Sequence, residues 1–110
     1  MDNTEQAYEC VEGLVRIRWD EIIYLESERH RITIHTMSGD YHIYRRLRDF
    51  EDSLCKSGFL RIHKSFLVNM IFVRQIRRYS ITLDNGIVLP VSKMKFNEIK
   101  SRIKQGAVGI

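Results

Sequence analysis

Residues 79–91 read Tyr-Ser-Ile-Thr-Leu-Asp-Asn-Gly-Ile-Val-Leu-Pro-Val, and this stretch decides the fold. Two short apolar runs, 79–83 and 87–91, flank Asp84-Asn85-Gly86. Because Asn-Gly tolerates the positive φ angles of a tight hairpin turn, the pattern predicts two antiparallel strands. Pro90 cannot donate a hydrogen bond to a neighbouring strand. The returning strand is therefore expected at a sheet edge, or to lose its pairing there.

Further short strands are expected upstream of this hairpin. Alternating apolar residues at 15–19 and a continuous apolar run at 22–25 predict a half-buried strand and a buried strand. Residues 32–44 alternate in the same way around Ser38-Gly39-Asp40, which predicts a second hairpin. The sequence thus favours an antiparallel β architecture.

Two segments change to helical spacing, and they predict short helices over 47–56 and 93–104. The first carries an apolar stripe at Leu47, Phe50 and Leu54, with Gly58 as a stop signal. The second repeats the spacing at Phe96, Ile99 and Ile103, after Ser92 as a candidate N-cap. The expected fold is one mainly β domain of eight to ten short strands and two short helices.

Length and composition limit the class of protein. The chain has 110 residues, of which 44% are hydrophobic and 29% charged, as in a single globular domain. No apolar run approaches the 18 or so residues of a membrane helix, and residues 1–10 are acidic and polar, unlike a signal peptide. We therefore expect a soluble, cytoplasmic protein. Cys10 and Cys55 are too few for a disulfide framework, so we expect them to be small, partly buried hydrophobic residues.

Charge is distributed unevenly along the chain. Residues 1–28 carry eight acids and two bases, a net −6, whereas the remaining residues carry a net +10. Between Asp52 and Asp84 there are six Lys and Arg residues and no acid. A basic stretch of this length suggests a surface that faces a polyanion, and a solvated basic face without a partner is the equal alternative.

Catalytic and metal-binding patterns are absent from the sequence. It contains no Gly-rich phosphate loop, no nucleophile elbow and no HExxH pattern. His30 and His35 are five residues apart, which places them on opposite faces of a strand and disfavours a shared metal. The sequence predicts a protein that is not an enzyme and that needs neither a metal nor another cofactor.

The stretch 59–69, Phe-Leu-Arg-Ile-His-Lys-Ser-Phe-Leu-Val-Asn, is the most informative for function. It mixes large apolar residues with several hydrogen-bond donors, as a contact to phosphates and bases requires. For His63 and Asn69 we favour an internal role, in which they satisfy backbone groups. For Lys64 and Ser65 we favour contact with a partner.

This stretch resembles the core motif of the LytTR family, the DNA-binding output domain of bacterial response regulators. Residues 20–26, Asp-Glu-Ile-Ile-Tyr-Leu-Glu, are similar to the family's opening motif, and residues 83–93 are similar to its closing motif. The resemblance covers residues 15–104. It implies an elongated antiparallel fold of about ten strands. It also implies loops that enter successive major grooves of double-stranded DNA at paired short repeats.

The resemblance also assigns roles by position. His30, Lys64 and Lys93 match the base-reading positions, and Lys64 suits the O6 and N7 acceptors of guanine. Lys93 stands where the family commonly has arginine, so it keeps the charge without the planar fork. Arg61 and Ser65 stand where the family has backbone contacts or loop supports. The full set of expected phosphate contacts is Arg29, Arg31, Arg61, Ser65, Arg77, Arg78 and Lys95.

Two alternatives to DNA binding remain open at this point. A small β fold also binds RNA when exposed aromatic residues stack on bases, and a basic face also docks an acidic protein. Residues 1–14 are expected to be an N-terminal lead or linker, too short for a receiver domain, and residues 105–110 a C-terminal tail. The chain then fits either an excised output domain or a naturally short regulator. Homodimerisation on DNA or through a receiver domain stays open.

Overall fold

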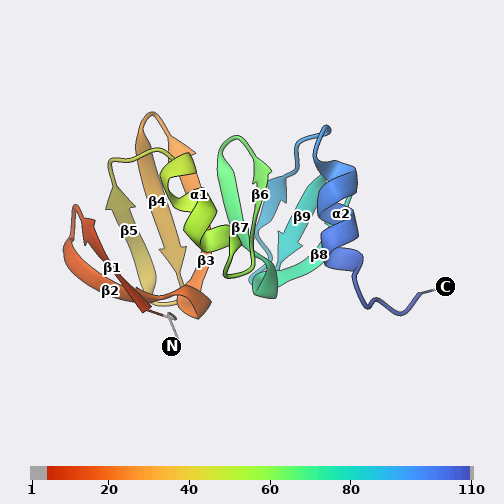
Figure 1. Cartoon of the computed structure of the whole chain (residues 1–110), viewed down its shortest axis with the longest axis horizontal. Helices are drawn as coiled ribbons and strands as arrows, with labels where there is room; N and C mark the ends of the chain where they lie inside the picture. The colour runs from red at the N-terminus through yellow and green to blue at the C-terminus, as the bar shows by residue number, and fades with distance from the viewer. Residues whose placement is uncertain (1–4, 110) are drawn as a thin grey trace.

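A five-stranded antiparallel sheet occupies the centre of the structure, a computed structural model that describes residues 5–109. Its strand order is β5-β4-β3-β7-β6, and Figure 1 shows it between two smaller sheets. The central strands are β3 (Ile22–Glu28), β4 (Arg31–Thr36), β5 (Gly39–Ile43), β6 (Phe59–His63) and β7 (Phe66–Asn69). The flanking sheets are β1 (Glu5–Cys10) with β2 (Gly13–Arg18), and β8 (Val73–Arg77), β9 (Ser80–Leu83) and β10 (Val88–Pro90) in the order β10-β9-β8. The predicted mainly β fold of about ten strands is confirmed, and its extents of 48 × 34 × 25 Å make it somewhat elongated.

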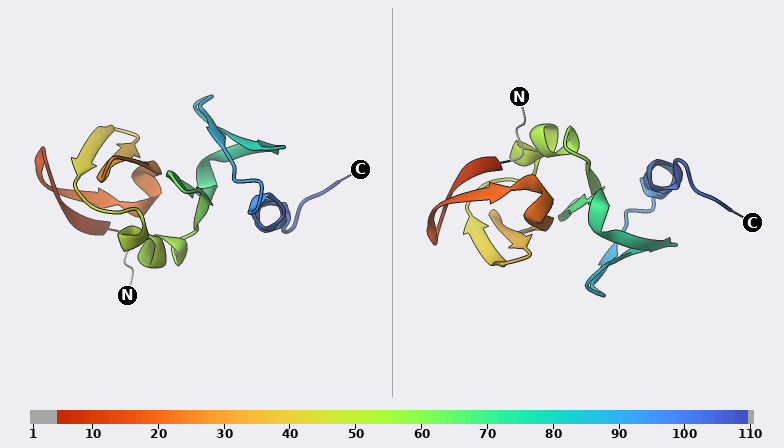
Figure 2. Two further views of the ribbon diagram at one scale, coloured as in Figure 1. Left: turned by 90° about the horizontal axis from the view of Figure 1, so that it is seen from above. Right: turned by 90° about the horizontal axis from the view of Figure 1, so that it is seen from below.

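Two α-helices lie on opposite faces of the central sheet, and the views from above and below in Figure 2 show them on either side of β6 and β7. They are α1 (Arg48–Cys55) and α2 (Phe96–Lys104), and two 3₁₀ helices, η1 (Trp19–Glu21) and η2 (Met70–Phe72), join strands. The predicted start of the second helix at 93 was wrong. The backbone N–H of Ser92 donates to the Ile62 carbonyl, 2.8 Å away, so Ser92 still belongs to the sheet region. Residues 93–95 form a turn, and Lys95 takes the N-cap position.

Two strands of the central sheet, β3 and β7, are buried on both faces. Tyr24 and Leu25 are neighbours in β3, yet they belong to different hydrophobic clusters, and so do Leu67 and Val68 in β7. Successive side chains of a strand point to opposite faces, so each strand contributes to both cores. One core lies under α1 and the β1–β2 hairpin, and the other lies under α2 and β8–β10. This explains why these strands are continuous apolar runs and do not alternate.

Part of the segment expected as an N-terminal lead forms a strand. β1 pairs along its whole length with β2, and Tyr8 is buried in the first core. The backbone N–H of Val11 donates to the His42 carbonyl (2.7 Å), and that of His42 donates to Glu12 Oε1 (2.9 Å), which joins the hairpin to β5. Hydrogen bonds from His42 hold the pKa of the Glu12 carboxyl below its usual range. Residues 1–4 lie outside the described residues, and Trp19 falls in η1 and not in a strand.

The hairpin predicted over 79–91 is confirmed in its pairing and differs in its turn. β9 and β10 pair antiparallel, and β10 is an edge strand, as expected from Pro90. Of the three turn residues Asp84, Asn85 and Gly86, Gly86 alone has a positive φ (89°). Its N–H donates to the Leu83 carbonyl, 2.9 Å away. Asn85 instead accepts from the Ile87 N–H through Oδ1 (3.0 Å). The turn therefore depends on the positive φ of Gly86 and on the side-chain oxygen of Asn85, which accepts a hydrogen bond.

Candidate nucleic-acid interface

The β3–β4 turn consists of two residues, Arg29 and His30, which join Glu28 directly to its partner Arg31. Both have positive φ, 51° and 66°. A two-residue hairpin that follows the twist of its strands requires this conformation, which is uncommon in residues other than glycine, although asparagine, aspartate and histidine adopt it more often than the others do. All three basic residues are exposed. A turn with positive φ that carries Arg29-His30 in place of glycine, followed by Arg31 in β4, is typical of a functional site.

The β6–β7 turn presents Lys64 to solvent and holds its neighbours inward. The backbone N–H of Ser65 donates to His63 Nδ1 (3.1 Å), and the Ser65 carbonyl accepts from the Ser27 N–H (2.9 Å). The second bond joins this turn to β3. Because β3 and β7 are antiparallel neighbours, the β3–β4 and β6–β7 turns lie at the same end of the sheet.

Arg61 supports the β6–β7 turn from within. Its guanidinium donates to the His63 carbonyl from Nε (2.9 Å) and to the Lys64 carbonyl from Nη2 (2.7 Å). Nη1 pairs with Glu51 Oε1 of α1 at 2.6 Å, and the Arg61 side chain is only 19% exposed. All three nitrogen atoms thus have partners inside the chain, and they fix the backbone on both sides of the turn.

The β10–α2 loop carries Lys93, and the Ser92–Ile62 hydrogen bond joins it to the end of β6. Lys93 is exposed, with Nζ 5.6 Å from the ring centroid of Tyr79. Tyr79 lies in the β8–β9 turn with Arg78, after Arg77 at the end of β8. Both arginines are exposed, and Tyr79 brings this turn beside Lys93. Lys95 is half-buried. Burial raises the pKa of the Cys55 thiol, and the positive charge of Lys95 acts in the opposite direction.

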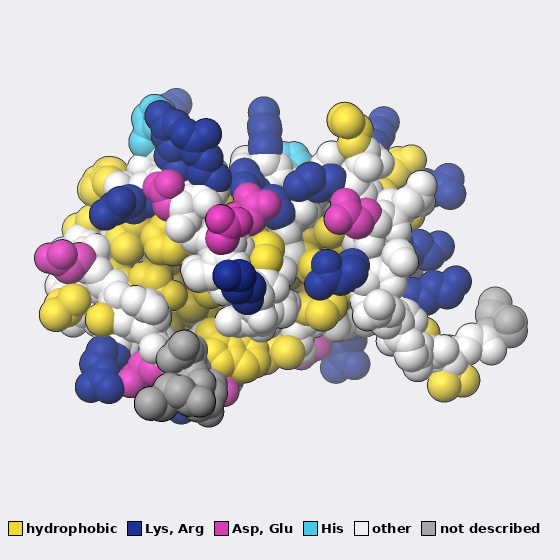
Figure 3. Space-filling view, viewed as in Figure 1, with side chains coloured by type: hydrophobic (Ala, Val, Ile, Leu, Met, Phe, Trp, Pro, Cys, Tyr) yellow, Lys and Arg dark blue, Asp and Glu magenta, His cyan; other side chains and the backbone are white. Residues whose placement is uncertain are grey.

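These turns occur along one long edge of the molecule. In Figure 1 the β3–β4, β6–β7 and β10–α2 connections all reach the upper edge, although they come from separate parts of the chain. In the same orientation, Figure 3 shows Lys, Arg and His side chains protruding along that edge. The structure therefore brings the three predicted base-reading residues, His30, Lys64 and Lys93, to one edge.

A basic pocket between the first two turns contains residues that the sequence analysis did not propose. The pocket, of about 230 Å³, is defined here by His30, Arg46, Arg48, Arg61 and Lys64. A hollow beside it, of about 440 Å³, shares His30, Arg46 and Arg48 and adds Arg45. The signal was present as Arg45-Arg46-Leu47-Arg48, which sequence periodicity identified only as the start of a helix.

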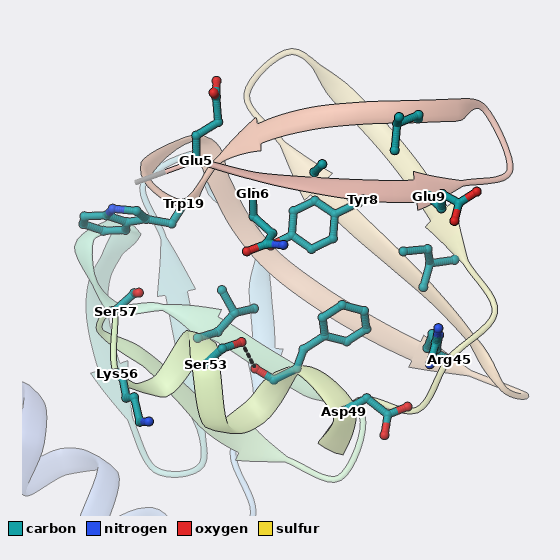
Figure 4. A pocket seen from close by; sticks show the side chains of 15 residues that line it. Glu5, Gln6, Tyr8, Glu9, Trp19, Arg45, Asp49, Ser53, Lys56 and Ser57 are labelled. Atoms are coloured by element: carbon teal, nitrogen blue, oxygen red, sulfur yellow. Dashed lines mark hydrogen bonds between the residues drawn. The ribbon is translucent and has the colours of Figure 1, made fainter. Parts of the chain in front are cut away.

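A larger hollow, of about 850 Å³, lies elsewhere, between the β1–β2 hairpin and α1. Figure 4 shows Tyr8, Trp19 and Glu9 around it, with Asp49 and Arg45 at its rim. Its lining mixes aromatic residues with charges of both signs. In residues 5–109 no group of three or more His, Cys, Asp or Glu side chains is placed to hold a metal ion.

The antiparallel fold and the basic edge formed by its turns place the chain in a class, that of mainly β domains whose basic surface suits nucleic acid. Comparison with known families identifies the member of that class. The LytTr DNA-binding domain model matches residues 12–104, and the chain belongs to this family. The family binds DNA and is not a family of enzymes, so the prediction of a non-enzymatic domain is confirmed.

Relatives and a solved structure agree with this assignment. The chain is 29% identical over 94 residues to the sensory transduction protein LytT of Bacillus subtilis, covering 81% of this chain and 39% of that protein. It is 25% identical over 92 residues to the transcriptional regulatory protein LytR of Staphylococcus aureus, covering 79% and 37%. The chain thus spans about two fifths of the relatives' length. A solved LytTr DNA-binding domain from Bacillus cereus has the same fold, with a TM-score of 0.75 at 21% identity over 93% of this chain and 97% of that one.

No helix within the described residues is long and apolar enough to cross a membrane.

Proposed function

We propose that this chain is the sequence-specific DNA-binding domain of a bacterial transcriptional regulator, active in the cytoplasm at paired promoter repeats. The observation that carries the proposal is the edge on which three exposed turns present His30, Lys64 and Lys93. These side chains come from turns, which fit between the walls of a major groove more easily than the flat face of a sheet does. Successive turns along one edge would follow the duplex into successive major grooves.

The two kinds of contact differ in the proposal. Lys64 is an exposed donor on a turn whose backbone is fixed, which suits the guanine O6 and N7 acceptors. His30 and Lys93 read the flanking positions. Phosphate contacts come from exposed cations beside the reading turns, namely Arg29, Arg31, Arg77 and Arg78, with Ser65 and Lys95 at their margins. Arg61 acts here as the support of the Lys64 turn.

Selection of bound duplexes from a random library tests this function. We expect enrichment of paired short motifs about one helical turn apart, one for each of two copies of the domain. Recovery of no duplex motif would overturn the proposal. Retention on heparin without any shift of duplex DNA would instead assign the basic edge to an acidic protein partner.

A further inference from the structure

The basic pocket concentrates positive charge that the chain does not neutralise. Five of its seven lining residues carry a cation or an imidazole, and none of the seven carries a carboxylate. Arg61 is paired with Glu51, whereas Arg46, Arg48 and Lys64 form no ion pair within residues 5–109. Like charges around a concave site repel one another, and an anion that entered would remove this repulsion.

The two arginines also stand at the unfavourable end of a helix. Arg46 and Arg48 occur at the N-terminus of α1, where the helix dipole favours negative charge. Asp49 lies beside them on the rim of the adjoining hollow, and its Oδ2 accepts from the Arg46 backbone N–H at 3.1 Å. A residue that contradicts a local preference without a gain inside the fold often marks a functional site.

The walls of the pocket are held in place before any ligand enters. The Arg61–Glu51 pair joins β6 to α1, and Arg61 also binds the carbonyls of the Lys64 turn. The Ser27–Ser65 backbone bond joins that turn to β3. The three elements that supply His30, Lys64 and the arginines are therefore coupled, so a bound anion would have a fixed position relative to both reading turns.

We propose that this pocket binds a phosphodiester of the DNA backbone, with Arg46 and Arg48 as its principal ligands. The inference rests on the proposed function and adds two residues and a location to it. Planar guanidinium groups bind phosphate oxygens through paired N–H donors, so two arginines that line one pocket suit a phosphodiester. The seated phosphate would lie between His30 and Lys64 and would set the register of both on the base edges.

Neutralising single phosphates tests the location directly. Each linkage of the selected duplex is replaced in turn by a methylphosphonate, and affinity is measured for the wild-type chain and for Arg46→Gln/Arg48→Gln. Arg102→Gln is the matched control, because Arg102 is exposed on α2. We expect one or two linkages whose neutralisation weakens wild-type and control binding about tenfold, the size of one charge-assisted hydrogen bond. The double variant should bind the unmodified duplex at least tenfold more weakly and lose its sensitivity at those linkages.

The other outcomes separate this inference from the proposed function. A double variant that keeps the wild-type methylphosphonate profile, with melting temperature unchanged, would overturn the pocket assignment and leave DNA binding intact. Failure of the wild-type chain to prefer any duplex would overturn the proposed function itself. Titration with inorganic phosphate, followed by amide NMR shifts around Arg46, forms a separate arm. Saturation there with no linkage dependence would assign the pocket to a free anion and overturn the DNA proposal.

Discussion

The side chains of Arg61 and His63 hold the β6–β7 turn, and the side chain of Lys64 faces solvent. Arg61 binds two carbonyls of the turn, and His63 Nδ1 accepts the Ser65 N–H. The Lys64 side chain is exposed and forms no hydrogen bond among the described residues. Fixing the backbone lowers the entropy that Lys64 loses when it binds, and this favours it as a base reader over the more mobile cations.

Lys64→Ala is expected to affect specificity more than general affinity. It should cost about 1–3 kcal/mol on the selected duplex and much less on a scrambled one, because base contacts discriminate between sequences. Fluorescence anisotropy with the two duplexes measures the difference. An equal loss on both would make Lys64 a phosphate contact.

Asn69 is expected to matter for stability and not for DNA contact. It is fully buried, donates from Nδ2 to the carbonyls of Trp19 (3.1 Å) and Ile22 (2.9 Å), and accepts from the Ile71 N–H (3.3 Å). Asn69→Ala removes three hydrogen bonds from a buried site and should lower the free energy of unfolding by about 2–4 kcal/mol. Urea denaturation measures the loss. Asn97→Ala, at an exposed position of α2, is the control and should change stability by less than about 0.5 kcal/mol.

At the scale of elements, substitutions in the β3–β4 turn distinguish a structural role of His30 from a role in DNA binding. His30 has φ of 66°, a conformation that glycine adopts freely and alanine does not. His30→Gly should therefore raise the melting temperature or leave it unchanged, whereas His30→Ala should lower it slightly. Both should weaken binding to the selected duplex by about 1–3 kcal/mol, because both remove the imidazole.

Calorimetry and anisotropy on the two His30 variants check this prediction together. If His30 served only the hairpin, His30→Gly would bind DNA as well as the wild-type chain does. A loss of affinity that followed melting temperature from one variant to the other would lead to the same conclusion.

Elements whose signals are local were predictable from sequence. The 79–91 hairpin depends on its own turn residues, and the α1 stripe buries Leu47 and Leu54 as the spacing predicts. The start of α2 was not predictable, because the Ser92–Ile62 hydrogen bond joins segments thirty residues apart. β1 was missed for a related reason. Only Tyr8 of its six residues is buried, so β1 has no apolar pattern that would predict a strand. The strand is formed by backbone pairing with β2.

The same distinction applies to the candidate site. His30, Lys64 and Lys93 followed from motif positions, and their positions on one edge agree with a shared role that remains to be tested. The basic pocket was not predictable, because its residues come from β3, the β5–α1 connection, the start of α1, β6 and two turns. Arg61 shows the opposite case. Its charge suggested a phosphate contact, whereas its three internal partners are visible only in the folded chain.

Over the whole molecule, charge and fold together suggest how strongly binding depends on salt. The net −6 of residues 1–28 lies mainly in β1–β3 and η1, and the net +10 of the remainder supplies most of the basic edge. Each phosphate that a protein cation neutralises releases counterions, which makes affinity fall as salt rises. Contacts with roughly four to seven phosphates should give a slope of log K against log salt near −4 to −6.

Arg78→Ala tests whether cations along the whole basic edge neutralise DNA phosphates. Arg78 is exposed in the β8–β9 turn and forms no ion pair among the described residues, so its loss should leave the fold intact. If it contacts a phosphate, the variant should bind selected and scrambled duplexes more weakly by similar factors, and its salt slope should be shallower by roughly one unit. Binding series at three salt concentrations measure both effects, with Lys64→Ala as the contrasting variant. A wild-type slope between 0 and −1 would contradict a phosphate-contacting edge, because so small a release of counterions corresponds to no more than about one neutralised phosphate.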